Sequence, residues 1–388
     1  MGKCRIALIT MHRLYGIVGG AERVLCDMAN ALVNKGYIVT ILCCEEKGGR
    51  PFYELNSGIE VKNFFNGIPF FSRQILRNLR SFDFDRKKKY TKRKKIECQW
   101  KAKSLKELVD LDDFDLFIAF DFESAYVLKD LLKEESPIIV MSHAEPSAGI
   151  TSQKYDILNN AVNRCAVLQV LMPQFIDECR TVLPDVPIVY IPNVAPQYKE
   201  SSALTSKTIV CVSRYEPISK RPALLVDAFA LISHKHLDWT VKFWGRFNGK
   251  KTEDIRSLVK QRNIDERFEL CGFTQNIKKE LLNGSIFVLP SAHEAFSLAL
   301  VEAMAVGLPV VGCSDCSSVS TLIQHGHNGL LVEPNAKALA EALETLISSL
   351  DLRCKLGKQA KIDVIKFSAD EVWMQWDNLI NRVLKGQI

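Results

Sequence analysis

The chain has 388 residues, which is too long for one ordinary hydrophobic core, so two domains are expected. Its 47% hydrophobic and 25% charged residues exclude a globally disordered protein. The net charge of +6 is concentrated: residues 73–103 hold 13 Lys/Arg and three Asp/Glu, giving +10, and the remaining 38 basic and 42 acidic residues give −4. This distribution disfavours a nucleic-acid coat that is basic over its whole surface.

The sequence predicts a cytoplasmic protein without a membrane-spanning helix. No run of 18 apolar residues occurs, and Met1–Arg5 leads into a strand-like run without the apolar core of a signal peptide. Most of the 12 cysteines lie in apolar runs, as reduced buried thiols do. Cys313 and Cys316 form one CxxC pair, and zinc sites need a second pair at matching spacing.

The first half of the chain alternates short apolar runs with helical patterns, which predicts parallel strands joined by helices. The predicted strands are Arg5–Thr10, Ile38–Cys44, Ile59–Phe64, Leu116–Phe120, Ile138–Met141, Val167–Leu171 and Ile188–Ile191. The predicted helices are Ala21–Asn34, Ser124–Leu132, Asp156–Arg164 and Gln174–Val182. The stretch 192–207, with Pro196 and several Ser and Thr, is typical of a linker.

The alternation then restarts, so a second α/β domain is predicted. Its predicted strands are Thr208–Val212, Thr240–Trp244, Phe268–Cys271, Ile286–Leu289, Pro309–Gly312 and Gly329–Val332. Its predicted helices are Arg221–Ser233, Lys250–Arg262, Leu298–Ala305 and Ala336–Ser349. The expected architecture is two doubly wound Rossmann-like domains, 1–195 and 207–367, facing a central cleft, with ligands at the carboxyl ends of the strands. A final amphipathic helix within 368–388 is expected to pack back toward the N-terminal domain.

The loop after the first strand closes with Gly19 and Gly20 directly before a predicted helix. Backbone N–H groups in such a turn can approach an anion, and a helix N-terminus favours negative charge. The spacing differs from the G-x-G-x-x-G pattern of dinucleotide folds, so a nicotinamide cofactor is not expected. A tight turn without any ligand remains the alternative reading of these glycines.

Two cations follow the first strand of the second half: Arg214 at its end, and Lys220 six residues later. A planar guanidinium fork and a mobile ammonium together suit a diphosphate. The alternative is a solvated, charged loop.

Two glutamates separated by seven residues stand in the apolar stretch after the predicted strand Ile286–Leu289. Glu294 lies on the loop and Glu302 two turns into the next helix. A carboxylate among apolar residues is costly unless it binds something. Glu294 suits sugar hydroxyls and Glu302 a ribose diol, while the helix start at Ala295–Ala299 offers free N–H groups to a phosphate. A helix-start acid and a rim residue are the alternative reading.

These motifs carry a family resemblance. The runs are GGAER at 19–23, VSR…K at 212–220, E-x7-E at 294–302, EAMAVGLPVV at 302–311 and NGLLVEP at 328–334. Together they resemble the retaining GT-B glycosyltransferases of family 4. The GGAERV start and the Ser-His pair at 142–143 are similar to enzymes that extend lipid-linked oligosaccharides.

The resemblance implies a metal-independent sugar transfer from a nucleotide-sugar donor, a substrate rather than a cofactor, to a glycan acceptor. The residues it places in catalysis are Glu294, His143, Arg214 and Lys220. The donor-binding residues it implies are Gly19, Gly20, Arg214, Lys220, Phe273, Glu294, Ala295, Phe296, Ser297, Leu298 and Glu302. Retention is expected by front-side departure, with no protein nucleophile, because no second carboxylate candidate accompanies Glu294.

The sequence departs from the family pattern at three places, which leaves the donor identity open. Ser317–Thr321 lacks the usual acid, Val194 replaces a usual glycine, and Arg246 follows Gly245 in place of a Gly-x-Gly turn. A UDP-linked hexose or N-acetylhexosamine is expected from the resemblance. A non-enzymatic nucleotide-sugar-binding module of the same fold, a soluble-acceptor transferase and a phosphorylase are the rival readings.

The basic insert 73–103 lies in the half that binds the acceptor in this family, and aromatic residues are interleaved with its cations. This mixture suits an anionic membrane surface or a lipid-linked acceptor, and places the protein on the cytoplasmic face of the membrane. A solvated loop and nucleic-acid binding are the alternatives, the latter disfavoured. The residues expected to act here are Arg73, Arg77, Arg80, Lys87, Lys88, Lys89, Lys92 and Arg93.

Overall fold

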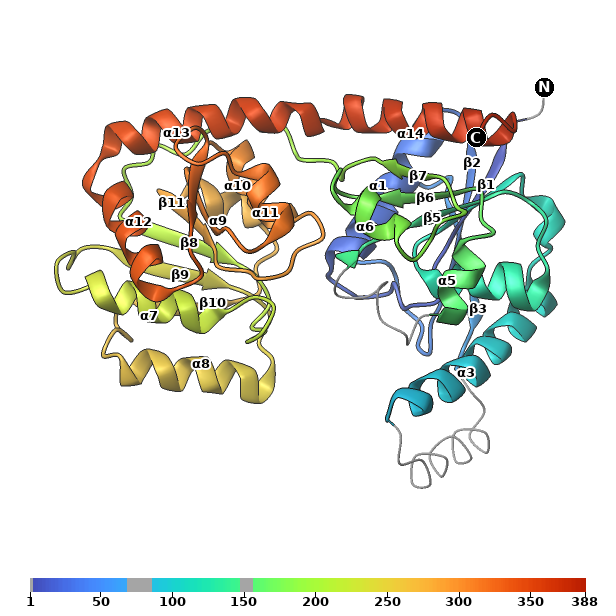
Figure 1. Ribbon diagram of the computed structural model, residues 1–388, viewed down its shortest axis with the longest axis horizontal. Helices are drawn as coiled ribbons and strands as arrows, with labels where there is room; N and C mark the ends of the chain where they lie inside the picture. The colour runs from blue at the N-terminus through green and yellow to red at the C-terminus, as the bar shows by residue number, and fades with distance from the viewer. Residues whose placement is uncertain (1–2, 68–85, 147–155) are drawn as a thin grey trace. The chain divides into compact units, whose positions relative to one another are not determined.

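A computed structural model describes residues 3–67, 86–146 and 156–388, with only the backbone described for residues 86–92. The chain divides into two compact units (Figure 1). Unit 1 comprises Met1–Pro192 with Val372–Ile388, and unit 2 comprises Asn193–Glu371. Each unit carries one parallel sheet with helices around it, so the prediction of two doubly wound, Rossmann-like α/β domains is confirmed.

The sheet of unit 1 has seven parallel strands in the order β3-β2-β1-β4-β5-β6-β7. They are β1 (Arg5–Ile9), β2 (Ile38–Cys44), β3 (Glu60–Phe65), β4 (Leu116–Ala119), β5 (Ile138–Met141), β6 (Val167–Val170) and β7 (Ile188–Tyr190). The central strands are apolar on both faces, as covered parallel strands are, and β1, β4 and β5 are almost fully buried. The strand order reverses between β1 and β4, where ligands bind in such sheets.

Helices flank this sheet. They are α1 (Gly20–Asn34), α3 (Arg86–Leu108), η1 (Leu111–Asp113), α4 (Phe122–Tyr126), η2 (Val127–Leu132), α5 (Asp156–Val162), α6 (Phe175–Arg180) and α14 (Ala369–Leu384). Residues 372–388, which hold most of α14, cluster with unit 1. The buried Trp376 and the 2.7 Å hydrogen bond from the Tyr37 hydroxyl to Asp377 Oδ1 anchor that helix.

Helix α3 was not predicted, because Lys and Arg dominate its sequence. Its few apolar residues nevertheless follow helical spacing: Cys98, Ala102 and Leu105 are buried on one face. Lys101 is buried as well, and its Nζ donates to the Met11 carbonyl at 2.8 Å and pairs with Glu97 Oε1 at 2.9 Å. The carboxyl half of the basic insert is therefore part of the unit 1 core.

The sheet of unit 2 has six parallel strands in the order β10-β9-β8-β11-β12-β13. They are β8 (Thr208–Val212), β9 (Thr240–Trp244), β10 (Phe268–Gly272), β11 (Ile286–Leu289), β12 (Val310–Cys313) and β13 (Gly329–Val332). These agree with the predicted strands to within one residue at each end. The order reverses between β8 and β11, so the loops after these strands flank the expected ligand position.

The helices of unit 2 are α7 (Pro222–Ile232), α8 (Gly249–Gln261), α9 (Ile277–Leu282), α10 (Leu298–Ala305), α11 (Ser317–Leu322), α12 (Ala336–Ser348), α13 (Leu350–Asp363) and η5 (Val364–Phe367). One hydrophobic cluster joins α7, α8 and α12 to the sheet, with Phe229, Phe243 and Leu343 fully buried in it. The apolar packing fixes the strand ends from which the charged loops project.

Residues 193–207, expected as a linker, are tied to unit 2. The Ser202 N–H donates to the Val306 carbonyl at 2.9 Å, and the Ser202 hydroxyl donates to the Gly284 carbonyl. Buried Arg353 donates to the Leu204 carbonyl from both Nε and Nη2, at 3.3 and 3.1 Å. Pro and Ser therefore mark an irregular but fixed segment here.

Candidate active site

The predicted residues Lys220 and Glu294 meet at the reversal point of the unit 2 sheet. Lys220 closes the loop after β8, and Glu294 stands on the loop after β11. Lys220 Nζ lies 2.6 Å from Glu294 Oε1 and donates to the His293 carbonyl at 3.2 Å. Both side chains are mostly enclosed, with 11% and 12% of their surface exposed. The ion pair thus lies where ligands bind in such sheets, so a ligand group could replace either partner.

Local hydrogen bonds hold these two loops together. The Ser219 carbonyl accepts from the N–H groups of Ala292 and His293, at 2.9 and 3.3 Å. The Ser291 hydroxyl donates to Glu294 Oε1 at 2.8 Å. The Glu294 carboxylate therefore has a neutral donor besides Lys220, which keeps it oriented when the ammonium is drawn elsewhere.

The segment 295–298 turns from the Glu294 loop into α10. Ser297 has a left-handed backbone with φ +59°, and Leu298 is the first residue of the helix. Phe296 is buried against Phe367, with the ring centroids 5.3 Å apart. Ala295 is half-buried between Glu294 and Phe296. Glu302 is buried in the second turn of the same helix.

Two further predicted residues lie at the carboxyl edge of the same sheet. Arg214 follows β8 and is exposed. Phe273 follows β10, and 42% of it is exposed. The Arg246 guanidinium lies 5.7 Å from the centroid of the Phe273 ring. The departure from the family pattern at Arg246 thus places a cation over the residue expected beside the nucleobase.

In unit 1, Gly19 and Gly20 begin α1. Gly19 is the N-cap, with an extended backbone, and Gly20 is exposed as the first helical residue. The Arg23 N–H donates to the Gly19 carbonyl at 3.1 Å as the helix starts. The first N–H groups of this 15-residue helix precede its intrahelical hydrogen bonds. Anion binding at Gly19 and Gly20 stays a prediction.

Three charged residues that the sequence analysis missed anchor this loop: the buried Glu45 and Lys101, and the half-buried Asp121. Glu45 Oε1 accepts from the N–H groups of Leu14 and Tyr15, the latter at 2.7 Å. Asp121 Oδ2 accepts from the Thr10 hydroxyl at 3.0 Å and from the Met11 N–H at 2.9 Å.

The third anchor is the ammonium of Lys101 on the Met11 carbonyl. Burial disfavours a charged ammonium, but the neighbouring Cys44 and Glu97 raise the pKa of Lys101 above its ordinary value. The sequence held a signal for the two carboxylates, since Glu45 and Asp121 directly follow the predicted strands Ile38–Cys44 and Leu116–Phe120. Acids at such positions reach the loop after the neighbouring strand.

His143 follows β5 in unit 1 and is held neutral. Its ring stacks on Phe120 with the centroids 5.3 Å apart, and within the described residues its buried Nε2 has no hydrogen-bond partner. Burial lowers the pKa of His143 to about 4, against a smaller opposing effect of the Asp121 charge. At neutral pH the imidazole therefore presents an uncharged, unsatisfied ring nitrogen.

The residues predicted to meet a membrane or acceptor are only partly described. Arg73, Arg77 and Arg80 lie outside the described residues. Lys87, Lys88, Lys89 and Lys92 lie on the described backbone of α3. Arg93 is exposed, whereas Lys94 pairs with Glu123 Oε1 at 2.5 Å. Exposed and internally paired cations thus alternate along one helix.

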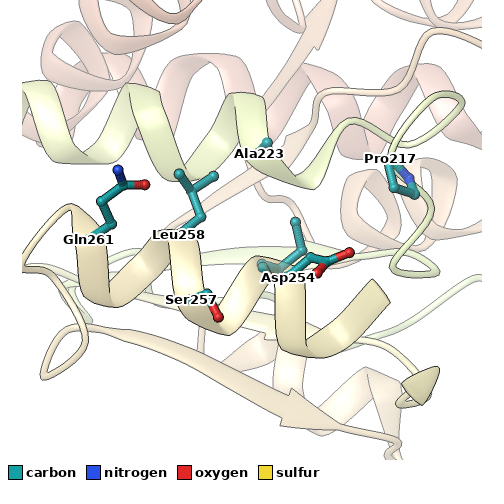
Figure 2. Close-up of a pocket in the computed structure, with 7 residues that line it drawn as sticks. Pro217, Ala223, Asp254, Ser257, Leu258 and Gln261 are labelled. Carbon is teal, nitrogen blue, oxygen red and sulfur yellow. The ribbon is translucent and has the colours of Figure 1, made fainter. Parts of the chain in front are cut away.

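A pocket of about 600 Å³ lies between α7 and α8 of unit 2 (Figure 2). It is lined by Pro217, Ala223, Asp254, Ile255, Ser257, Leu258 and Gln261. None of the predicted site residues lines it. Over residues 3–67, 86–146 and 156–388, no group of three His, Cys, Asp or Glu side chains could hold a metal ion, and no helix is long and apolar enough to cross a membrane.

Residues 196–363 match the family model of group 1 glycosyl transferases. An exopolysaccharide phosphotransferase of Streptomyces coelicolor is 34% identical over half of this chain, and the match spans 21% of that protein. An uncharacterized glycosyltransferase of Haemophilus influenzae is 23% identical over 94% of this chain and 97% of its own length. A diphospho-undecaprenol N-acetylgalactosaminyltransferase of Campylobacter jejuni is 29% identical over 46% of this chain and 49% of that enzyme.

Solved structures share the fold at low identity. Sucrose-phosphate synthase from Thermosynechococcus elongatus superposes with a TM-score of 0.81, at 18% identity, over 99% of this chain and all of that one. TarM of Staphylococcus aureus superposes with a TM-score of 0.77, at 14% identity, over 97% of this chain and all of that one. The predicted GT-B fold is thereby confirmed. The family model and the named relatives support the predicted glycosyltransferase activity.

Proposed function

We propose that the chain is a group 1 glycosyltransferase that moves a hexosyl group from a UDP-sugar to a lipid-linked glycan, with retention of configuration. The match of residues 196–363 to that family model supports the proposal. The observation that carries the proposal is the contact between Lys220 and Glu294 at the reversal point of the unit 2 sheet. The Campylobacter relative acts on a diphospho-undecaprenol acceptor, and the TarM crystals contained UDP. Both facts support this choice of donor and acceptor.

In the proposed reaction, Lys220 and Arg214 bind the donor diphosphate and stabilise the negative charge that develops on the departing nucleotide. Glu294 accepts hydrogen bonds from the hydroxyls of the donor sugar, and Glu302 from the ribose. Donor binding thus replaces the Lys220–Glu294 ion pair with two ligand contacts. The 2.8 Å bond from the Ser291 hydroxyl keeps the carboxylate in place during this exchange.

Retention is proposed to proceed on one face of the donor sugar. The bond from the anomeric carbon to the leaving phosphate oxygen breaks, the acceptor oxygen forms a bond on the same side, and its proton passes to the phosphate. No divalent metal is needed in this scheme, because Lys220, Arg214 and helix N–H groups supply the positive field. His143, neutral at pH 7, is proposed to donate or accept a hydrogen bond with a sugar hydroxyl rather than to carry charge.

The basic insert is proposed to bring the enzyme to the anionic cytoplasmic face of a membrane, where a lipid-linked acceptor resides. The exposed Arg93 of α3, together with Lys87, Lys88, Lys89 and Lys92, supplies the cations of this contact. A transferase with a soluble acceptor is the alternative, and it needs no such surface.

Calorimetric titration with UDP-, GDP- and ADP-sugars tests the donor, followed by transfer of the bound sugar to a polyprenyl-diphosphate-linked acceptor. We expect the UDP-sugar to bind, and Glu294→Gln to weaken transfer by about 10²-fold or more. Glu344→Gln is the matched control, because Glu344 pairs with Lys235 at 3.0 Å on the surface of the same unit. Full transfer by the Glu294→Gln enzyme would show that the site is assigned wrongly.

A further inference from the structure

Arg221, directly after Lys220, has an unusual backbone conformation. Its φ of +46° and ψ of +50° place it in the left-handed region, which L-residues other than glycine rarely adopt. The next residue is Pro222, and a residue before proline favours the extended region instead. Two independent preferences are therefore overridden at Arg221, so the surroundings must hold it there.

The contact that holds Arg221 is a two-pronged ion pair with Asp315. Nη1 lies 3.0 Å from Oδ1, and Nη2 lies 2.5 Å from Oδ2. Asp315 belongs to the loop after β12, so this pair connects the first and third of three adjacent strand-end loops. The planar fork of a guanidinium on a carboxylate fixes orientation as well as distance.

Lys220 is thereby held from both sides. On one side, Ser219 is bonded through its carbonyl to the backbone of Ala292 and His293, on the loop after β11. On the other side, Arg221 is bonded to Asp315 on the loop after β12. Between these two anchors the Lys220 side chain reaches Glu294, with Nζ 2.6 Å from Oε1.

We propose that Arg221 and Asp315 form a positioning pair, which holds residue 221 left-handed and so aims Lys220 into the donor site. The proposal rests on the function proposed for Lys220, because its value to the enzyme depends on Lys220 binding the diphosphate. Arg221 and Asp315 are not assigned any contact with the substrate. They act through the backbone of the residue between the two anchors.

A pair that acts through the backbone conformation of residue 221 responds differently to substitution than a simple ion pair does. Glycine adopts positive φ without a steric cost, so a glycine at 221 needs no carboxylate to hold it. Asp315→Ala is expected to misdirect Lys220, and the double variant Arg221→Gly with Asp315→Ala is expected to restore its direction. The double variant Arg221→Ala with Asp315→Ala is expected to stay misdirected, since alanine has the same left-handed penalty as arginine.

The direct measurement is the rate at which N-hydroxysuccinimidyl acetate acylates Lys220, followed by peptide mass spectrometry with exposed Lys235 as internal reference. In Asp315→Ala we expect labelling of Lys220 to quicken by about fivefold to thirtyfold, the range that a left-handed penalty of one to two kcal/mol allows. In the Arg221→Gly/Asp315→Ala variant we expect the slow wild-type rate. Asp315→Asn, which keeps the side-chain volume, replaces Asp315→Ala if that variant does not fold.

Asp227→Ala is the matched control, because it breaks the Arg262–Asp227 pair of similar exposure on the same unit, whose atoms lie 2.7 Å apart. It is expected to leave the labelling of Lys220 unchanged. Unchanged labelling in Asp315→Ala, or equal behaviour of the glycine and alanine double variants, overturns the positioning role.

The labelling needs no donor, so it also separates this inference from the proposed function. If no nucleotide sugar binds to the wild type but the glycine variant still rescues labelling, the proposed function fails and the positioning role stands. If donor binds and transfer occurs, kcat should fall about tenfold in Asp315→Ala and return in the glycine double variant, within the same penalty.

Discussion

Both sheets have acidic residues after the strands near the reversal point, but these acids bind different partners in the two units. In unit 1, acids that follow strands β2 and β4, Glu45 and Asp121, accept hydrogen bonds from the backbone of the loop after β1. In unit 2, acids on the loops after β11 and β12, Glu294 and Asp315, pair with the cations Lys220 and Arg221 of the loop after β8. Each sheet therefore closes its reversal point with carboxylates, but on different partners.

The two sheets differ in whether a ligand could replace the contacts of their carboxylates. Glu45 is completely buried and accepts hydrogen bonds from the backbone N–H groups of Leu14 and Tyr15, which a buried loop must satisfy internally. The Lys220 and Glu294 side chains keep a small exposed fraction and are joined through groups that a diphosphate and a sugar could each replace. The loop of unit 1 is thus a fixed frame, whereas the loop of unit 2 holds an exchangeable ion pair.

The largest effect is expected from Lys220→Ala, which removes the exchangeable cation. We expect kcat/KM for transfer to fall by about 10²- to 10³-fold, the usual effect of losing one preorganised contact to developing negative charge. Lys235→Ala, which breaks a surface Lys–Glu pair of the same unit, is expected to leave kcat/KM unchanged. Steady-state kinetics with the donor identified by calorimetry makes the comparison. Equal kcat/KM values for the two variants would remove Lys220 from the site.

Glu45→Gln tests the fixed frame of unit 1. The amide keeps the shape of the carboxylate but loses the charge that strengthens its bonds to Leu14, Tyr15 and Arg13. We expect a loss of about 2–3 kcal/mol in the free energy of unfolding of unit 1, since hydrogen bonds to a buried charge are involved.

Hydrogen exchange of peptides covering residues 6–15 reports this loss, because a multidomain chain need not unfold in one step. Glu107→Gln is the control, since Glu107 forms only an exposed pair with Lys103 at 3.8 Å. Exchange that is equally slow in both variants would mean that Glu45 does not anchor the loop.

The buried ring of His143 gives unit 1 a pH-dependent stability. Its pKa of about 4 in the folded protein lies below the ordinary value of 6.5. Between these two pH values the unfolded chain binds more protons than the folded one, so stability rises with pH across this window and falls as pH drops toward 4.

Between pH 7 and pH 4.5, we expect the free energy of unfolding to fall by about 1–3 kcal/mol more in the wild type than in the His143→Gln variant. Urea unfolding of both proteins at the two pH values, followed by exchange in unit 1, measures the difference. Parallel losses in the two proteins would contradict a buried neutral imidazole. The same neutrality implies that any acidic limb of the activity profile near pH 6.5 belongs to another group.

The strands of both sheets could be predicted from the sequence because each is a short apolar run between turn residues, and burial on both faces leaves no ambiguity. Helix α3 could not, since Cys98, Ala102 and Leu105 are few among 23 residues that are mostly basic. Helix α13 was also missed: its apolar pattern is weak, and Arg353 in its first turn is buried and donates to carbonyls of other segments. Contacts with other segments stabilise both helices, and a local pattern does not reveal such contacts.

At the site, Lys220 and Glu294 could be predicted because charged residues at strand ends converge at one sheet edge. Asp315 could not, because its partner is 94 residues away and the pair has meaning only through the left-handed backbone of Arg221. A backbone conformation that opposes local preference leaves no trace in composition or spacing. The same holds for Lys101, whose charge looked like part of a solvated basic run.

The exposed lysines of the basic helix α3 give the smallest expected effect on stability. Lys94 pairs with the buried Glu123, whereas Lys103 and Lys106 are exposed. Lys94→Ala leaves an uncompensated buried carboxylate and should destabilise unit 1 by about 1–3 kcal/mol.

Lys103→Ala and Lys106→Ala should each change the stability of unit 1 by less than about 0.5 kcal/mol. For the proposed membrane contact, the double variant Lys92→Ala/Arg93→Ala should weaken flotation with phosphatidylserine vesicles and leave neutral phosphatidylcholine vesicles unaffected. If flotation is lost in Lys94→Ala but kept in the double variant, the exposed cations do not bind the membrane. The binding surface would then depend on the fold of α3 rather than on its outward charge.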